Sequence, residues 1–116
     1  MNPSPEQIRE RVAAGAAWLD EKQPGWEARV NTERLNMEST CDCILGQVYE
    51  EAAQASDWFD WDFYEGAYWY VLQEHVGNRG SDWPVEHGFT LLGATYGDWA
   101  ALEAAWVDLL KTRAAA

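Results

Sequence analysis

The sequence predicts a mainly α-helical fold: one compact domain over residues 1–116, built as a bundle of four or five short helices. The length is that of a single domain, and folding should bury about two-thirds of the surface of the unfolded chain. A hydrophobic fraction of 47% and eight tryptophans supply enough apolar surface for a core. Near both ends of the chain, apolar residues recur at helical spacing. We find no repeat and no low-complexity linker that would divide the chain.

The first predicted helix begins near Pro5 and ends at Pro24 and Gly25. At its start, Ser4 can accept a hydrogen bond from a free backbone N–H and Gln7 can reach back, while Pro5 needs no donor there. Its apolar positions form one narrow stripe, Ile8, Val12, Gly15, Ala16 and Leu19. The small residues in the stripe should let a neighbouring segment approach closely.

A helical turn and a connector are predicted over residues 26–37, with Asn31 or Thr32 capping a second turn. The expected core residues of this segment are Trp26, Val30, Leu35 and Met37. A second helix is predicted to start between residues 39 and 42 and to continue to residue 52. Ile44, Val48 and Ala52 share one of its faces, and Gly46 within it indicates close packing.

The central segment is predicted to be helical from Asp57 or Asp60 to Val76, with Gly77 as the C-cap. Residues 60–63 alternate between acidic and aromatic residues, which is also typical of a strand. A loop over residues 78–84 and one helical turn over residues 85–88 should follow, after which Phe89 returns to the core.

The last predicted helix has Asp98 as its N-cap and an apolar face formed by Trp99, Leu102, Trp106, Leu109 and Leu110. Lys111 and Arg113 suit its C-terminal end, where basic side chains interact favourably with the helix dipole. Residues 114–116 are expected to fray.

Acidic and aromatic side chains are concentrated in the middle of the chain. Residues 57–70, DWFDWDFYEGAYWY, hold eight of the sixteen aromatic residues and four carboxylates, with no basic residue. The net charge is −12, and fourteen acids stand against one base, Arg79, between Leu35 and Leu110. Such a potential repels phosphate backbones, which argues against direct nucleic-acid binding, and attracts basic protein surfaces. Keeping a tryptophan-rich domain in solution is the simpler role for the same acids.

The N-terminal residues and the cysteines predict a cytoplasmic protein. Residues 1–12 lack the apolar core of a signal peptide, and no apolar run approaches the ~20 residues that span a bilayer. We therefore expect no membrane partner. Cys41 and Cys43 are separated by one residue, too close for a relaxed disulfide, and both are expected to be free thiols.

One family resemblance covers most of the chain. Its most specific part is the string Cys43-Ile44-Leu45-Gly46-Gln47, which follows the turn Pro24-Gly25-Trp26 and the residues Val30, Leu35 and Met37. With Gly88-Phe89 and the helix through Leu102 and Trp106, this pattern resembles short uncharacterised proteins of actinobacterial phages and prophages. The resemblance implies a phage protein that acts inside a bacterial host and implies no reaction type. The acidic aromatic segment after Gln47 departs from the pattern.

The metal-binding alternatives fit the sequence poorly. Cys41, Cys43, His75 and His87 do not have the closely spaced pairs of a structural zinc site. Asp57, Asp60, Asp62 and Glu65 could supply oxygens to calcium, but bulky Trp and Phe fill the places where an EF-hand loop needs a turn. We predict no metal and no cofactor.

An enzymatic alternative remains at the same segment. Paired carboxylates beside tryptophan are typical of sugar sites, so a small hydrolase or carbohydrate-binding domain is the chief alternative. It requires two carboxylates buried together in a cleft. Glu74-His75 and Glu86-His87 have no serine or cysteine placed to complete a recognisable triad, and we predict no catalytic residue.

The sequence therefore favours a non-enzymatic protein that binds and modulates a host protein through an acidic, aromatic surface within residues 50–65. The expected contact residues are Asp57, Trp58, Asp60, Trp61, Asp62 and Glu65. Exposed aromatic residues would anchor a basic partner, and the carboxylates would form the rim. Mimicry of DNA is a special case of this binding. Pairing of the aromatic surface with its copy in a homodimer is a further candidate.

Overall fold

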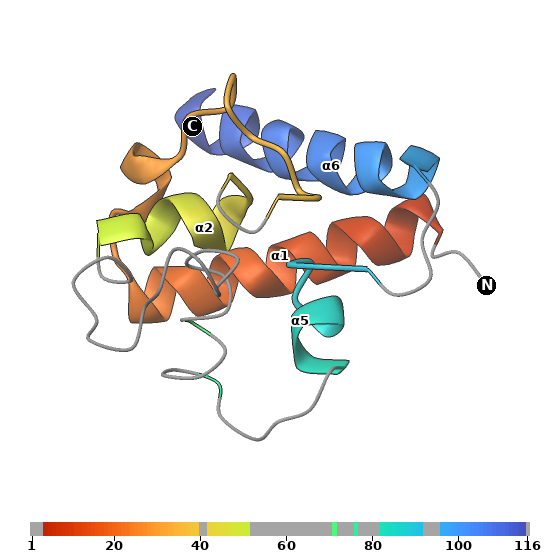
Figure 1. The fold of residues 1–116 in the computed structure, drawn as a ribbon, viewed down its shortest axis with the longest axis horizontal. Helices are drawn as coiled ribbons and strands as arrows, with labels where there is room; N and C mark the ends of the chain where they lie inside the picture. Colours follow the sequence, from red (N-terminus) through yellow and green to blue (C-terminus); the bar gives the residue numbers. More distant parts are fainter. Residues whose placement is uncertain are drawn as a thin grey trace, which may run out of the picture.

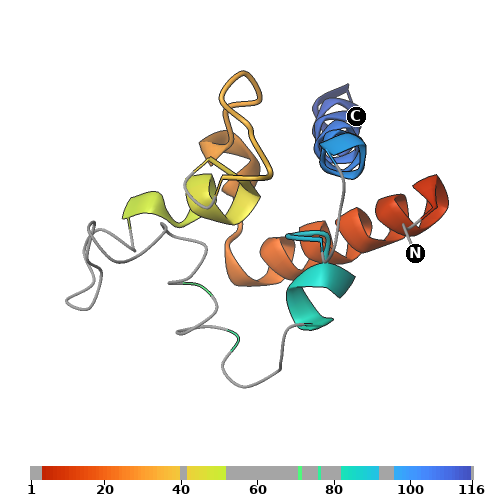
Figure 2. The same cartoon turned by 45° about the vertical axis from the view of Figure 1, so that its right-hand side comes forward.

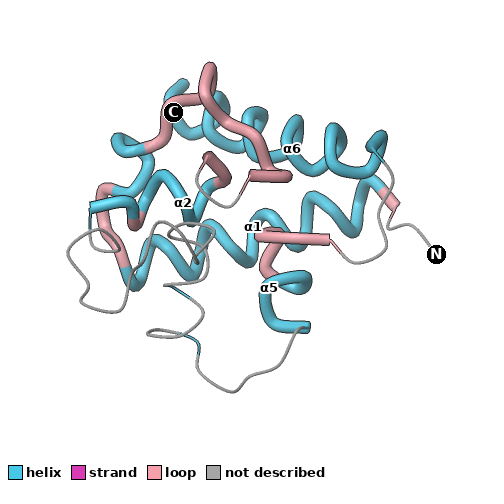
Figure 3. The backbone as a smooth tube through the Cα atoms, viewed as in Figure 1, coloured by secondary structure: helices cyan, strands magenta, loops and turns pink. Residues whose placement is uncertain are grey.

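A computed structural model describes residues 4–39, 42–51, 71, 76, 82–91 and 96–115 of the chain. Its helices are α1 (Pro5–Lys22), the 3-10 helix η1 (Trp26–Arg29), α2 (Ile44–Val48), α5 (Asp82–Glu86) and α6 (Tyr96–Ala115), and the described residues include no strand (Figures 1 and 3). The Cα radius of gyration is 13.5 Å, close to the roughly 13 Å of a compact globule of this length. The predicted mainly α-helical class is confirmed.

Helix α1 is the central element of the fold. Helix α6 packs along one side of it and α5 against another, while α2 lies next to η1. Figures 1 and 2 show α6 and α5 on opposite sides of α1, and both long helices run in the same general direction. The contact between α6 and α1 thereby brings together two helices that are more than seventy residues apart in sequence.

Large aromatic side chains from separate segments form the centre of the core. Trp26, Tyr49, Phe89 and Trp106 are each at most 1% exposed. The Phe89 and Trp106 rings stack with centroids 5.7 Å apart, and Trp26 meets Trp106 edge-on at 6.1 Å. The indole N–H of Trp106 donates a 2.7 Å hydrogen bond to the Gly88 carbonyl, so the buried ring keeps its polar group satisfied.

Two glycines allow α1 to meet the segment after α5. A Cβ on Gly15 would lie 2.0 Å from the His87 carbonyl oxygen, and a Cβ on Gly88 would lie 2.9 Å from the Val12 Cα. Gly88 also has φ +70°, a conformation that costs a residue with a side chain more than it costs glycine. The segment His87–Gly88 is therefore the neighbour that packs closely against the predicted stripe of α1.

The prediction for the first helix is confirmed in detail. Ser4 and Gln7 form the reciprocal capping box, and the predicted stripe is the buried face of α1. After Gly25, which has φ +84°, η1 supplies the predicted helical turn. Trp26 is buried, as are Leu35 and Met37, whereas Val30 is half-buried.

The second helix is shorter than predicted. Helix α2 begins at Ile44, and Cys43 is its N-cap rather than part of it, because the Cys43 sulfur accepts from the Gly46 N–H at 3.3 Å. Ile44 and Val48 are buried on the predicted face. The predicted central helix lies outside the described residues apart from Val71 and Val76, both of which are buried.

Both C-terminal helices begin earlier than predicted. Asp82, Trp83 and Pro84 belong to α5 instead of a loop, because a proline in the first helical turn needs no backbone donor. Helix α6 begins at Tyr96, so Asp98 lies in its first turn and is not its N-cap. Ala114 and Ala115, which are expected to fray, belong to the helix. Leu102 and Trp106 are buried and Trp99, Leu109 and Leu110 half-buried, as the predicted apolar face requires.

Candidate functional site

The predicted binding segment is outside the part of the chain that the structure describes. This applies to all its contact residues, Asp57, Trp58, Asp60, Trp61, Asp62 and Glu65, and also to Cys41 and His75. The structure does describe residues that flank this segment in sequence, and it describes the surface of the two long helices.

Cys43 and His87, the two candidate zinc ligands among the described residues, both have structural contacts instead. Cys43 is buried and caps α2, as described above. The His87 ring stacks on Trp83 with centroids 4.1 Å apart, and its Nδ1 lies 2.8 Å from the Trp83 carbonyl oxygen. Within the described residues, no three His, Cys, Asp or Glu side chains come together in a group that could hold a metal ion.

Gln47 connects the start of α2 to the preceding connector. Its side-chain oxygen accepts from the Asn31 N–H at 2.7 Å, and its amide nitrogen donates to the carbonyls of Asp42 at 2.8 Å and of Asn31 at 3.3 Å. Gln47 is buried, so these bonds replace water for polar groups inside the fold. The string from Cys43 to Gln47 therefore acts in the architecture of the connector, and its residues are all buried.

Acidic residues on both sides of the predicted binding segment are exposed. Glu51 precedes it, and Asp82 and Glu86 follow it on α5. Among the described residues, none of these three carboxylates forms an ion pair, whereas Glu50 and Asp42 both contact Arg34. Three acidic residues that flank the segment in sequence are therefore at the surface.

A second surface feature, an apolar groove between α1 and α6, is absent from the sequence-based predictions. Its volume is about 570 Å³. Apolar side chains cover most of its walls, namely Pro5, Ile8 and Val12 from α1 and Ala101, Ala104, Ala105 and Leu109 from α6. The available signal was the set of alanines at three- and four-residue spacing on α6, which lie beside its buried face and leave little bulk to fill the space.

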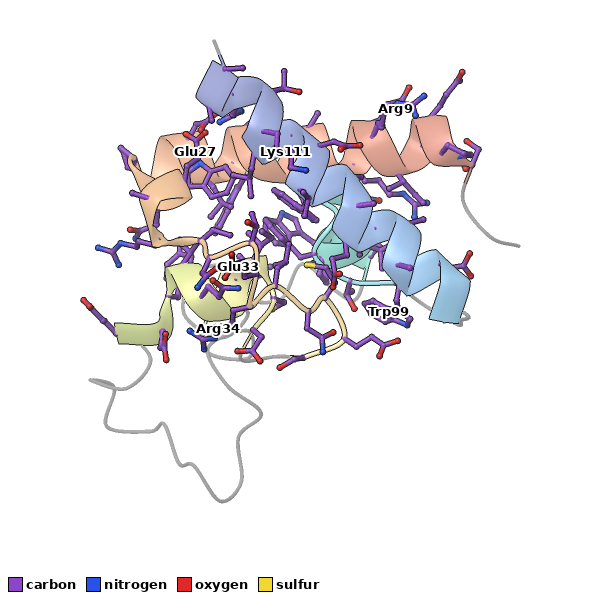
Figure 4. All side chains as sticks on the ribbon, turned by 90° about the horizontal axis from the view of Figure 1, so that it is seen from above. Arg9, Glu27, Glu33, Arg34, Trp99 and Lys111 are labelled. Atoms are coloured by element: carbon purple, nitrogen blue, oxygen red, sulfur yellow. The ribbon has the colours of Figure 1, made fainter. Side chains whose placement is uncertain are left out.

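The groove also has opposite charges on its two walls. Arg9 lies on α1, and Asp108 lies on α6; both are exposed. Among the described residues, neither side chain takes part in an ion pair. Figure 4 shows Arg9 on α1 and, seen from above, α6 crossing over α1. The two walls thus offer unpaired partners of opposite sign.

Arg113, which also lines the groove, is held by contacts with Asp20 and Trp26. Its guanidinium donates to the two Asp20 carboxylate oxygens at 2.8 and 3.0 Å and lies 5.8 Å from the centroid of the Trp26 ring. The hydrogen bond from Arg113, followed by that from the Trp26 indole, lowers the pKa of Asp20. The same bond raises the pKa of Arg113. These contacts join the C-terminal ends of α1 and α6.

No protein-family model, curated protein or solved structure matches the chain. No helix among the described residues is long and apolar enough to cross a membrane.

Proposed function

We propose that the protein is a non-enzymatic, phage-encoded accessory protein that works in the bacterial cytoplasm by binding a host protein with a basic surface. The binding surface comprises Asp57, Trp58, Asp60, Trp61, Asp62 and Glu65. The resemblance to actinobacteriophage proteins supports the origin, and the acidic aromatic composition of residues 57–70 supports the mode of binding.

The observation that carries the proposal is that acidic residues before and after the segment in the sequence are exposed. Glu51, Asp82 and Glu86 are exposed, and none of them forms an ion pair among the described residues. Carboxylates without basic partners contribute no salt bridges to the fold. Together with the segment, which has no basic residue, they create a negative potential that attracts a positively charged protein surface.

The composition of the described core gives separate support. Trp26, Tyr49, Phe89 and Trp106 are buried in it, and Trp83 is buried beside Phe89. The eight aromatic residues of the segment come in addition to these, in a chain of 116 residues. Aromatic side chains beyond the needs of a small core are typical anchors of protein interfaces, where Trp and Tyr contribute most of the binding energy.

Each residue class of the proposed site has its own role. Trp58 and Trp61 enter apolar pockets of the partner and lose contact with water there. Asp57, Asp60, Asp62 and Glu65 surround them, accelerate association and select lysine- and arginine-rich surfaces. A host protein that binds DNA has such a surface, and spaced carboxylates on this protein would then occupy the position of phosphates.

A pull-down from an actinobacterial lysate tests the proposal. The variant with Asp57→Asn, Asp60→Asn and Asp62→Asn should lose the partner that the unmodified protein captures. The matched control carries Glu6→Gln, Glu10→Gln and Glu33→Gln, three exposed acids outside the segment, and has the same net charge as the first variant. Capture should persist with this control. Equal capture by both variants would contradict the assigned site, and equal loss would show that only net charge matters.

A further inference from the structure

We infer that the α1–α6 groove is a self-association surface, in which a second copy of the chain docks so that Arg9 of each copy meets Asp108 of the other. This inference does not depend on residues 57–65 or on the function proposed for them. It starts from a groove of about 570 Å³ that is lined mainly by apolar side chains and open to solvent.

The arrangement of charges identifies the occupant. In a two-fold dimer, contact between residue i of one copy and residue j of the other is always repeated in the reverse sense. Arg9 and Asp108 line opposite walls of one groove, are exposed, and form no ion pair among the described residues. A two-fold axis passing between them brings each cation to the anion of the other copy. One contact surface thereby yields two ion pairs.

The distribution of net charge also favours this face for contact between copies. Helices α1 and α6 contain five basic and seven acidic residues, a net charge of −2, whereas the rest of the chain contains three basic and thirteen acidic residues, a net charge of −10. Contact between copies through these two helices brings together the segments with the lower net charge. An interface through the acidic middle of the chain would oppose many like charges.

The groove walls suit the approach of another helix. Ala101 and Ala104 are exposed, and each has only a methyl group as its side chain. They let the surface of a second α6 enter the groove, while Leu109 and Ile8 supply larger apolar contacts. A specific dimer interface buries about 1,000 Å² or more in total, so contacts should continue along both helices beyond the groove.

A charge-reversal cycle measured by analytical ultracentrifugation tests the inference. The unmodified protein should show a concentration-dependent monomer–dimer equilibrium. Arg9→Glu and Asp108→Arg, each alone, should raise the dimer Kd about tenfold or more, because each creates two like-charge contacts. The double variant Arg9→Glu with Asp108→Arg should return the Kd close to the starting value. Rescue by the second reversal distinguishes a direct contact from a general effect of charge.

A matched control changes charge outside both helices. Asp82→Arg makes the same change as Asp108→Arg, and Asp82 is exposed on α5 and does not line the groove. This control should keep the original Kd, and circular dichroism should be the same for all variants. A monomer at every concentration would overturn the inference. It would also be overturned by single variants that dimerise normally, by a double variant without rescue, or by a control that weakens the dimer equally.

Discussion

At the scale of single residues, Gly15 occupies the position where a side chain is least tolerable. It lies on the buried face of α1, directly against the backbone of His87, with the Phe89 and Trp106 rings each 3.1 Å from the place of a Cβ. A flexible side chain could move aside, but a backbone carbonyl at 2.0 Å can move only with its segment. Gly15 therefore determines how closely α5 and the following turn pack on α1.

Gly15→Ala should destabilise the protein by about 2 kcal/mol or more, although alanine is the better helix former by roughly 1 kcal/mol. Urea unfolding followed by circular dichroism measures the change. Gly97→Ala is the matched control, because Gly97 is exposed in the first turn of α6. That substitution should be neutral or slightly stabilising. Equal effects of the two substitutions would contradict the close contact at Gly15.

Asp20 should contribute stability that depends on pH. The hydrogen bonds from Arg113 and Trp26 lower its pKa from the ordinary value of 3.8. A carboxyl group with a lowered pKa in the folded state stabilises the fold above its ordinary pKa, and this contribution disappears as the pH falls through the folded pKa. The Asp20 side chain is 46% exposed, so solvent screening limits the effect.

Asp20→Asn should therefore lower the free energy of unfolding at pH 7, within about 1 kcal/mol, and the difference from the unmodified protein should shrink below pH 3.8. Urea unfolding at pH 7 and pH 3 measures it. Glu21→Gln serves as the control, because Glu21 only approaches Lys22, at 3.7 Å on the exposed surface. A difference that is independent of pH would show that the charge of Asp20 does not act as described.

At the scale of elements, α2 depends on polar contacts that lie outside its own few residues. A helix of this length is not stable by itself in water. Cys43 caps its start, and Arg29 donates to the Val48 carbonyl at its end at 3.3 Å. Gln47 then connects α2 to the connector through Asn31 and Asp42. The helix and the connector consequently form one cooperative unit.

Gln47→Leu should destabilise the protein by about 1–3 kcal/mol, because a side chain of similar size leaves the Asn31 N–H without its hydrogen-bond acceptor and removes one of the two donors to each of the Asn31 and Asp42 carbonyls. Thermal and urea unfolding measure the loss. Gln23→Leu is the control: among the described residues the Gln23 side chain has no hydrogen bond, and the change should stay within about 0.5 kcal/mol. An equally stable Gln47→Leu protein would contradict the bridging role.

The sequence predicted elements well where their signals were local. The capping box at Ser4, the stripe on α1 and the apolar face of α6 depend on residues within a few positions of one another. The sequence does not predict the start of α5, because Pro84 is compatible with both the end of a loop and a first helical turn. It predicts Cys43 inside α2, because the role of Cys43 as a cap depends on its φ and ψ angles, which composition does not specify.

The α1–α6 groove could not have been predicted by the same reasoning. Its walls belong to opposite ends of the chain, and its volume depends on how α6 crosses α1. Arg9 and Asp108 line the same groove only because of this packing. The acidic aromatic site within residues 57–65 was read from composition alone, and it stays a prediction because it lies outside the described residues.

At the scale of the whole molecule, charge separates two surfaces with different proposed partners. The pair α1 and α6 carries little net charge and has the groove proposed for a second copy. The middle of the chain carries almost all of the negative charge and is proposed to meet a basic host protein. A dimer formed through α1 and α6 would contain two copies of the acidic segment, so that one dimer could bind two partners or two sites on one partner.

The central claim is that residues 57–65 present aromatic side chains for binding. Acrylamide quenching of tryptophan fluorescence tests this claim most directly. Quenching should be compared between the unmodified protein and the variants Trp58→Phe and Trp61→Phe. Trp106→Phe is the control for a fully buried ring. The account predicts that removing Trp58 or Trp61 removes the most accessible part of the emission while the circular dichroism spectrum is unchanged. Quenching that is the same with and without both residues would show that they are shielded from water and would contradict the proposed site.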